Sequence, residues 1–222
     1  MRTRLGLDIG TNSIGWCFYD GDSIRDLGVR IFSDGRDPKS GASLAVDRRD
    51  ARAMRRRRDR FLGRRSALLR VLRTYGLMPD GDEAKALARQ DPYTLRGQAL
   101  SGPITPHQLG RAVFHLNQRR GFRSNRKADR SSKETKDGKI ATATKALDAA
   151  MLAAGAPTLG VFLAQQPTKR VRMRLEADGY DFYPDRRHIE AEFDAIWSAQ
   201  VQYHPTVLTD AARAAIKRVI FH

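Results

Sequence analysis

Asp8 is the residue of this chain best placed to do carboxylate chemistry. It lies in an apolar stretch in which Leu5, Leu7 and Ile9 recur at every second position, the pattern of a β-strand. The two glycines that flank it on its own face leave room for a ligand. Its carboxylate suits a hydrated divalent cation such as magnesium, and it equally suits a cap for the following turn. The strand pattern alone favours neither role.

Two short basic stretches hold the whole net charge of +16. The first, residues 48–73, has twelve arginines against two aspartates, and the second, residues 117–139, has nine lysines or arginines against three acidic residues. Concentrated positive charge is the electrostatic footprint of a protein that binds a polyphosphate. Arginine also suits phosphate oxygens, because its guanidinium fork donates two parallel hydrogen bonds. The charge pattern therefore predicts a nucleic acid ligand.

The candidate nucleic-acid-binding residues are the basic side chains at the centre of these two stretches. They are Arg48, Arg49, Arg52, Arg55, Arg56, Arg57, Arg58, Arg60, Arg64 and Arg65 in the first, and Arg119, Arg120, Arg123, Arg126 and Lys127 in the second. Phe122 lies among the latter, where it either stacks on a base or fills the core. Charge runs usually mark a solvated face, but twelve arginines facing two acids repel one another without a polyanion.

The rest of the composition excludes several classes of protein. Cys17 is the only cysteine, which rules out an intramolecular disulfide framework and a zinc site built from several cysteines. The N-terminus lacks the apolar core of a secretory signal, and no apolar run approaches the roughly 20 residues that span a bilayer. The histidines show no short metal-ligand spacing. We therefore expect a cytoplasmic protein without a membrane partner.

Periodicity predicts an α+β fold. Residues 5–9, 14–19 and 24–32 read as three strands separated by turn residues, which together make an antiparallel meander, and residues 33–43 read as a loop. A long arginine-rich helix follows, because its sequence has neither Gly nor Pro before Gly63. Its apolar stripe consists of Met54, Phe61, Leu68 and Leu72.

The remainder of the chain is predicted to be mostly helical. Thr105 and Pro106 form a helix start, followed by a buried face at Leu109, Ala112, Val113 and Leu116. Residues 124–142 are polar and read as a mobile or ligand-ordered loop. Three helical regions follow: two short helices within 143–163, a helix at 186–199 with Ile189, Phe193, Ile196 and Trp197 at helical spacing, and an amphipathic helix from about residue 210.

The segment LDIGTNSIGW, residues 7–16, resembles two families. Sugar kinases and actin-like ATPases open with a similar Asp-x-Gly-Thr turn that meets nucleotide phosphates. RuvC-type nucleases, on a ribonuclease H-like sheet, use the same Asp as a metal ligand. The arginine-rich helix that comes next favours the nuclease, because a sugar kinase has no use for it.

The order of four motifs resembles the type II CRISPR-associated RNA-guided DNA endonucleases, in particular their compact II-C branch. Residues 5–16 resemble the first RuvC motif, and ARAMRRRRDRFLGRRSALLRVL (51–72) resembles the arginine-rich bridge helix. DPYTLRGQAL (91–100) with HLNQRRGFRSNRK (115–127), and later YPDRRHIEAEFDAIW (183–197), resemble the start of the recognition lobe. The resemblance implies a first RuvC segment at 1–46, a bridge helix at 47–75 and the start of a helical recognition lobe at 76–222.

This resemblance implies an antiviral defence nuclease of the bacterial cytoplasm. Its partners would be a guide RNA (crRNA with tracrRNA), target DNA and an acidic anti-CRISPR inhibitor. Asp8 would be a catalytic residue and one ligand of Mg²⁺ or Mn²⁺, while the other RuvC segments and the HNH nuclease are missing from this sequence. We therefore expect an N-terminal fragment that is inactive alone. The alternatives are an actin-like or sugar-kinase-type phosphate-binding domain, a small nickase relative, and a non-catalytic module that binds RNA and docks inhibitors.

Overall fold

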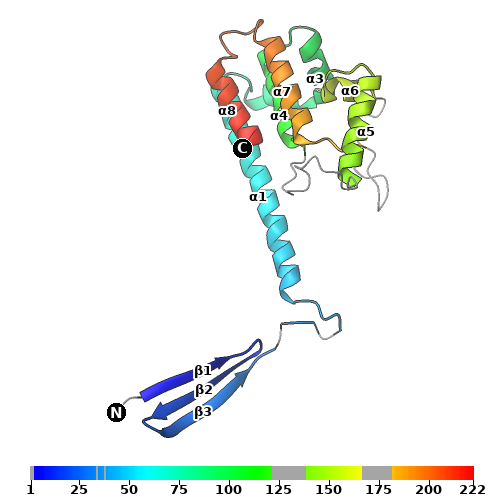
Figure 1. Ribbon diagram of the computed structural model, residues 1–222. Helices are drawn as coiled ribbons and strands as arrows, with labels where there is room; N and C mark the ends of the chain where they lie inside the picture. The colour runs from blue at the N-terminus through cyan, green and yellow to red at the C-terminus, as the bar shows by residue number, and fades with distance from the viewer. Residues whose placement is uncertain (1–2, 34, 38, 122–138, 167–181) are drawn as a thin grey trace. The chain divides into compact units, whose positions relative to one another are not determined.

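The computed structural model describes residues 3–33, 35–37, 39–121, 139–166 and 182–222. The chain divides into two compact units, Met1–Arg60 and Phe61–His222. The first unit contains an antiparallel sheet and the second is helical (Figure 1), so the predicted α+β class is confirmed. No helix within the described ranges is long and apolar enough to cross a membrane.

The sheet is the predicted three-stranded meander. Strands β1 (Thr3–Ile9), β2 (Ser13–Asp20) and β3 (Ser23–Ile31) pair in the order β1-β2-β3, and all pairs are antiparallel. The register of β2 against β3 shifts by one residue between Phe18 and Tyr19. The register sets Asp8 opposite Gly15, so Asp8 has a neighbour without a side chain on its own face.

The arginine-rich stretch forms one helix, α1 (Ala45–Thr74), of 30 residues. At 1.5 Å per residue it is about 45 Å long. Gly63 lies in its interior without ending it. The predicted apolar stripe is buried only in its second half: Leu68 and Leu72 are fully buried, whereas Met54 is 63% exposed and Phe61 is 37% exposed. Leu68 and Leu72 belong to the hydrophobic core of the second unit, and Leu69 and Val71 pack against it.

Seven shorter helices follow in the described part of the chain. They are α2 (Gly81–Arg89), α3 (Pro92–Ser101), α4 (Pro106–Gln118), α5 (Lys139–Ala153), α6 (Leu159–Gln165), α7 (Arg186–Gln200) and α8 (Asp210–Phe221). The predicted start of α4 is confirmed, because Thr105 accepts from the Gln108 N–H in a capping box with Pro106 at N1. The predicted loop at 124–142 is wrong at its end: α5 already begins at Lys139, where alanines favour helix. The earlier part of that loop lies outside the described residues.

One hydrophobic core holds the second unit together. The predicted face of α4 is confirmed, since all four of its residues are fully buried, and Ile189, Phe193, Ile196 and Trp197 of α7 are buried as well. Helix α3 packs against α4, α6 and α7, as Figure 1 shows. Gly110 lets α4 approach the chain after α1, because a Cβ there would lie 1.6 Å from the Leu77 carbonyl oxygen. The core thereby fixes the C-terminal end of α1 to α4.

Candidate nucleic-acid interface

The N-terminal half of α1 presents its arginines to solvent. The eight predicted residues that belong to the first unit are all exposed: Arg48, Arg49, Arg52, Arg55, Arg56, Arg57, Arg58 and Arg60. Arg49, Arg52, Arg56, Arg57 and Arg60 line a hollow of about 370 Å³ together with Ala53. Their spacing of three, four and four residues places Arg49, Arg52, Arg56 and Arg60 along one side of the helix. The short side chain of Ala53 leaves the space between these guanidinium groups.

The next two predicted arginines lie in the second unit, and its packing holds both. Arg64 is half-buried and donates from Nε to the Asn117 side-chain oxygen at 3.0 Å, while Asn117 itself is fully buried on α4. The guanidinium of Arg65 lies over the ring of Phe114, 5.7 Å from its centroid, in a cation–π contact. These contacts orient the two side chains, which reduces the entropy that they lose when they bind a ligand.

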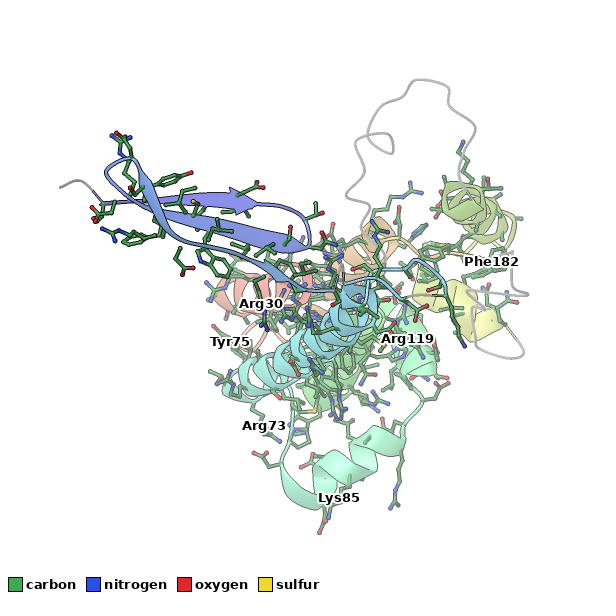
Figure 2. All side chains as sticks on the ribbon, turned by 90° about the horizontal axis from the view of Figure 1, so that it is seen from below. Arg30, Arg73, Tyr75, Lys85, Arg119 and Phe182 are labelled. Carbon is green, nitrogen blue, oxygen red and sulfur yellow. The ribbon has the colours of Figure 1, made fainter. Side chains whose placement is uncertain are left out.

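Arg119 and Arg120 follow α4. Arg119, labelled in Figure 2, is the C-cap residue of this helix and is exposed. Arg120 is half-buried and donates from Nη1 to the Ile220 carbonyl oxygen at 3.0 Å. Gly121 has a φ of +73°, and a Cβ on it would lie 2.3 Å from the Asp185 carbonyl oxygen. A glycine is therefore required where the chain turns against the start of α7.

Four residues that the sequence singles out for this interface lie outside the described residues. They are Arg123, Arg126 and Lys127, which were predicted to bind nucleic acid, and Phe122, which was predicted either to stack on a base or to fill the core. The structure therefore brings Arg64, Arg65, Arg119 and Arg120 to one compact unit, and it leaves the roles of the other four as predictions.

Asp8 is the next-to-last residue of β1 and is exposed. The turn after it is closed by backbone groups: the Gly10 N–H donates to the Ser13 carbonyl, and the Phe32 N–H donates to the Asn12 carbonyl. Among the described residues, no hydrogen bond links the Asp8 carboxylate to this turn. The glycine opposite it, Gly15, would place a Cβ 3.6 Å from the Asp8 Cβ, so the space beside the carboxylate is open. The turn-cap role gains no support from these contacts.

One carboxylate does not make a magnesium site. A divalent cation of this kind needs several oxygen ligands, and nuclease sites with two metals use more than one carboxylate. Within the described ranges, no group of three His, Cys, Asp or Glu side chains is arranged to hold a metal ion. The described residues therefore do not fit a complete magnesium or manganese centre, and Asp8 can act only as one ligand of a larger set.

A buried charged centre in the second unit was missed from the sequence. Arg96 on α3 and Glu192 on α7 form a bidentate ion pair, and their side chains are 1% and 0% exposed. Arg96 also contacts His115 Nδ1 at 3.3 Å, and Glu192 accepts from the Gly160 N–H at 2.9 Å. Burial and then the positive charges of Arg96, Arg111 and Arg119 lower the pKa of His115 to about 3, so its ring is neutral and accepts from Arg96.

The sequence does contain a signal for this centre. Glu192 lies between Ile189 and Ile196 on the apolar face of α7, and a charged residue on a buried face needs a partner. Arg96 interrupts the apolar face of α3 in the same way, next to Leu95 and close to Ala99. The sequence alone does not show that these two residues meet. Their contact joins α3, α4, α6 and α7, and it positions the helix that ends at Arg119.

A scan against models of known protein families finds no match. The chain is 37% identical over 146 residues to the CRISPR-associated endonuclease Cas9 of Campylobacter jejuni. This match covers 60% of the chain and 14% of that protein. The chain therefore spans a small part of the length of the curated relative that it matches.

Solved structures of Cas9 also resemble this chain. The crystal structure of Campylobacter jejuni Cas9 in complex with sgRNA and target DNA matches with a TM-score of 0.64 and 26% identity, over 100% of this chain and 30% of that chain. The St1Cas9–sgRNA–tDNA20–AcrIIA6 dimeric assembly matches with a TM-score of 0.63 and 24% identity, over 99% of this chain and 26% of that chain. The second match concerns the fold alone.

Proposed function

We propose that this chain, which is related in sequence and in fold to the Cas9 endonucleases, is the RNA-binding N-terminal part of an RNA-guided DNA endonuclease. The observation that carries this proposal is the exposed arginine face of α1, residues 48–60. The similar Campylobacter jejuni Cas9 is described in complex with sgRNA and target DNA, so a guide RNA and target DNA are the partners that we propose here. The setting would be the bacterial cytoplasm.

On this proposal three segments of the chain have separate roles. Residues 1–46 are the first RuvC segment, 47–75 the bridge helix and 76–222 the start of the recognition lobe. In RNA-guided nucleases base pairing reads the target sequence, and the protein holds the heteroduplex through its backbone. The arginines of α1 therefore bind phosphates of the guide strand without reading its bases. Arg64, Arg65, Arg119 and Arg120 add phosphate or sugar contacts from the second unit, and Arg123, Arg126 and Lys127 continue them.

Asp8 supplies one ligand to a divalent metal site in the longer enzyme. Magnesium or manganese bound there would activate water and stabilise the charge of the phosphate being cleaved. This chain itself contributes the strand that holds the carboxylate and the open space beside Gly15. The chain alone is inactive as a nuclease. An acidic inhibitor protein would bind the arginine face of α1 in place of RNA, because both present a high density of negative charge.

The kinase-like alternative is weaker. The Asp-x-Gly-Thr turn alone serves either family, but the arginine face of α1 has no role in binding a single nucleotide. The similarity to Cas9 in sequence supports the nuclease interpretation as well. A nucleotide-dependent rise of the melting temperature would favour the kinase.

RNA binding as a function of salt concentration tests the proposal. We expect the chain to bind an RNA hairpin with a single-stranded extension, and its affinity to fall by about a thousandfold between about 50 and 200 mM salt if six phosphates are contacted. Replacing Arg56 and Arg60 by glutamine should make the negative slope of log K against log salt shallower by about 2. An affinity that does not depend on salt would contradict the proposal.

The control variant removes the same charge elsewhere. Arg89 on α2 and Arg218 on α8 are exposed, like Arg56 and Arg60. Replacing both by glutamine lowers the net charge equally, so it reproduces any effect of overall charge. If the two double variants weaken binding to the same extent, the α1 face is not the binding surface.

A further inference from the structure

Asn117 on α4 is a buried amide whose nitrogen is unpaired. Its side chain is 0% exposed. The side-chain oxygen accepts from Arg64 Nε at 3.0 Å, and this contact fixes which end of the amide faces Arg64, because a guanidinium only donates. The amide nitrogen, Nδ2, has no hydrogen-bond partner among the described residues. The fold therefore buries the N–H donors of Asn117 without pairing them.

The stability of the fold does not account for an amide at this position. A buried donor without an acceptor destabilises the folded state, whereas leucine, which branches at the same carbon, has no donor to leave unpaired. Val113 and Leu116 on the same helix are fully buried core residues, so apolar side chains suit these surroundings. Arg64 is only half-buried, so water reaches part of its guanidinium. What the amide contributes is therefore the position of Arg64.

The contact with Asn117 restricts the orientation of the Arg64 guanidinium. Every nitrogen of a guanidinium carries N–H donors, so a bond at Nε is compatible with parallel bonds from the Nη atoms to a phosphate. An arginine that binds RNA from a mobile state loses the freedom of a long side chain, and this loss lowers the affinity. Because Asn117 holds Arg64 at Nε before RNA binds, the loss is smaller.

Phe114 has the same relationship to the next arginine of α1. It precedes Asn117 by three residues, so the two lie on one face of α4. Its side chain is 7% exposed, and the Arg65 guanidinium lies over its ring, 5.7 Å from the centroid. Arg65 itself is exposed, so this contact leaves it accessible to a ligand. One helix thus holds two consecutive arginines through side chains that carry no charge.

We propose that Asn117 and Phe114 are positioning residues for RNA binding: Asn117 orients Arg64, and Phe114 orients Arg65, for contact with phosphates of the RNA backbone. The inference rests on the proposed function, and it adds to it two buried residues that do not touch RNA themselves. It also gives a reason for the unpaired amide, because Asn117 serves the affinity for RNA at the expense of stability.

Double-mutant cycles in RNA binding test these roles. The variants are Asn117→Leu, Phe114→Leu, Arg64→Gln and Arg65→Gln, alone and in pairs, each measured with the RNA hairpin at one salt concentration. We expect Asn117→Leu to weaken binding about fivefold when Arg64 is present and less than about twofold in Arg64→Gln, because an arginine that is missing cannot be positioned. Phe114→Leu should depend on Arg65 in the same way.

The crossed pairs are matched controls, because Arg64→Gln and Arg65→Gln remove the same charge from neighbouring positions. Asn117→Leu should keep its full effect in Arg65→Gln, and Phe114→Leu should keep its full effect in Arg64→Gln. If Asn117 and Phe114 only support the fold, each weakens binding by the same factor in every background. Equal factors in the matched and the crossed pairs would therefore overturn the inference.

Melting temperatures separate positioning from folding at Asn117. We expect the melting temperature of Asn117→Leu to equal or exceed that of the unaltered chain, because the substitution removes unpaired buried donors. A fall of more than about 3 °C would assign Asn117 to the fold. If Asn117→Leu does not fold, Asn117→Ala replaces it in the binding cycle with the same expected factors.

The single arginine variants separate this inference from the proposed function. Arg64→Gln and Arg65→Gln should each make the negative slope of log K against log salt shallower by about 1. If RNA binding needs Arg56 and Arg60 but neither Arg64 nor Arg65, the positioning roles are wrong and the proposed function stands. If the unaltered chain binds no RNA, the proposed function and the positioning roles are both wrong.

Discussion

Arg96 and Glu192 form a bidentate ion pair at the centre of the helical unit, although they are 96 residues apart in the chain. The Nε–Oε1 and Nη2–Oε2 distances are both 2.6 Å, and the side chains of Arg96 and Glu192 are 1% and 0% exposed. Arg96 also lies over the Tyr93 ring, 5.6 Å from its centroid. This pair joins α3 to α7. Because Arg96 also contacts His115 on α4, the pair helps to position α4 and the arginines that follow it.

Breaking this pair from one side should destabilise the protein strongly. We expect Glu192→Gln to lower the free energy of unfolding by about 3–5 kcal/mol, because Arg96 is left as an uncompensated buried charge. The double variant Arg96→Met with Glu192→Leu should recover most of the loss, except about 1–3 kcal/mol for the Gly160 N–H that loses its acceptor. Urea unfolding of the unaltered chain, the single variant and the double variant measures the three free energies. A single variant that costs less than about 1 kcal/mol would show that water reaches the centre.

His188 should make the stability of the helical unit depend on pH. The side chain is 6% exposed; its Nε2 lies 2.7 Å from Asp148 Oδ1 on α5, and its Nδ1 lies 2.9 Å from Asp185 Oδ1. Although burial alone acts in the opposite direction, the hydrogen bonds and charges of Asp185 and Asp148 raise the pKa of His188 above 6.5. Arg187, which pairs with the same two carboxylates, adds a competing positive charge.

The sign of the effect follows from the raised pKa. A group whose pKa is higher in the folded state contributes stability that is fully present below its unfolded value, here about 6.5, and is lost as pH rises through the folded value. As pH rises above about 6.5, we therefore expect the free energy of unfolding of the unaltered chain to fall relative to that of His188→Gln. Urea unfolding at several pH values gives the difference, and parallel curves for the two proteins would contradict the assignment. In the unaltered chain the N-terminal turn of α7 should remain folded after His188 loses its proton, because its neutral Nδ1 accepts the Asp185 N–H at 3.1 Å.

Alanine substitutions at Gly110 and Gly63 should change the free energy of unfolding in opposite directions. A Cβ at Gly110 would lie 1.6 Å from the Leu77 carbonyl oxygen, so Gly110→Ala forces the backbone apart and should cost at least about 2 kcal/mol. Gly63 has no neighbouring atom within 4 Å of the same position and lies inside α1. Gly63→Ala should therefore stabilise the chain by about 0.5–1 kcal/mol through helix propensity. Urea midpoints of the two variants decide this, and a shift in the same direction for both would contradict it.

Asp8 should have no catalytic effect in this chain alone. With magnesium or manganese present, we expect no cleavage of plasmid DNA above background, and the same background in Asp8→Ala, because one carboxylate cannot hold the metal site. In a longer enzyme that contains this segment, Asp8→Ala should abolish cutting of one DNA strand and leave guided binding intact. Strand-specific labels separate the two strands. Loss of binding together with cutting would assign Asp8 a structural role.

Local pattern predicted most of the elements. The three strands, the cap at Thr105 and the apolar faces of α4 and α7 follow from residue types a few positions apart, and the structure confirms them. The apolar stripe of α1 shows the limit of this reasoning. Helical spacing places Met54 and Phe61 on one side with Leu68 and Leu72, but spacing does not show where the core ends. Burial of that stripe depends on what packs against it.

The sequence by itself determined the charge, its concentration in two stretches and the position of Asp8 between glycines on a strand. It also determined the order of motifs that resembles Cas9, because all of these are properties of neighbouring residues. Only the tertiary structure decided which distant residues meet. It paired Arg96 with Glu192 and brought Arg120 and Arg186 to the carbonyl oxygens of Ile220 and Phe221, contacts that join residues from 35 to 100 positions apart in the chain. Such contacts form because packing one core places several helix ends together, and no local pattern encodes that placement.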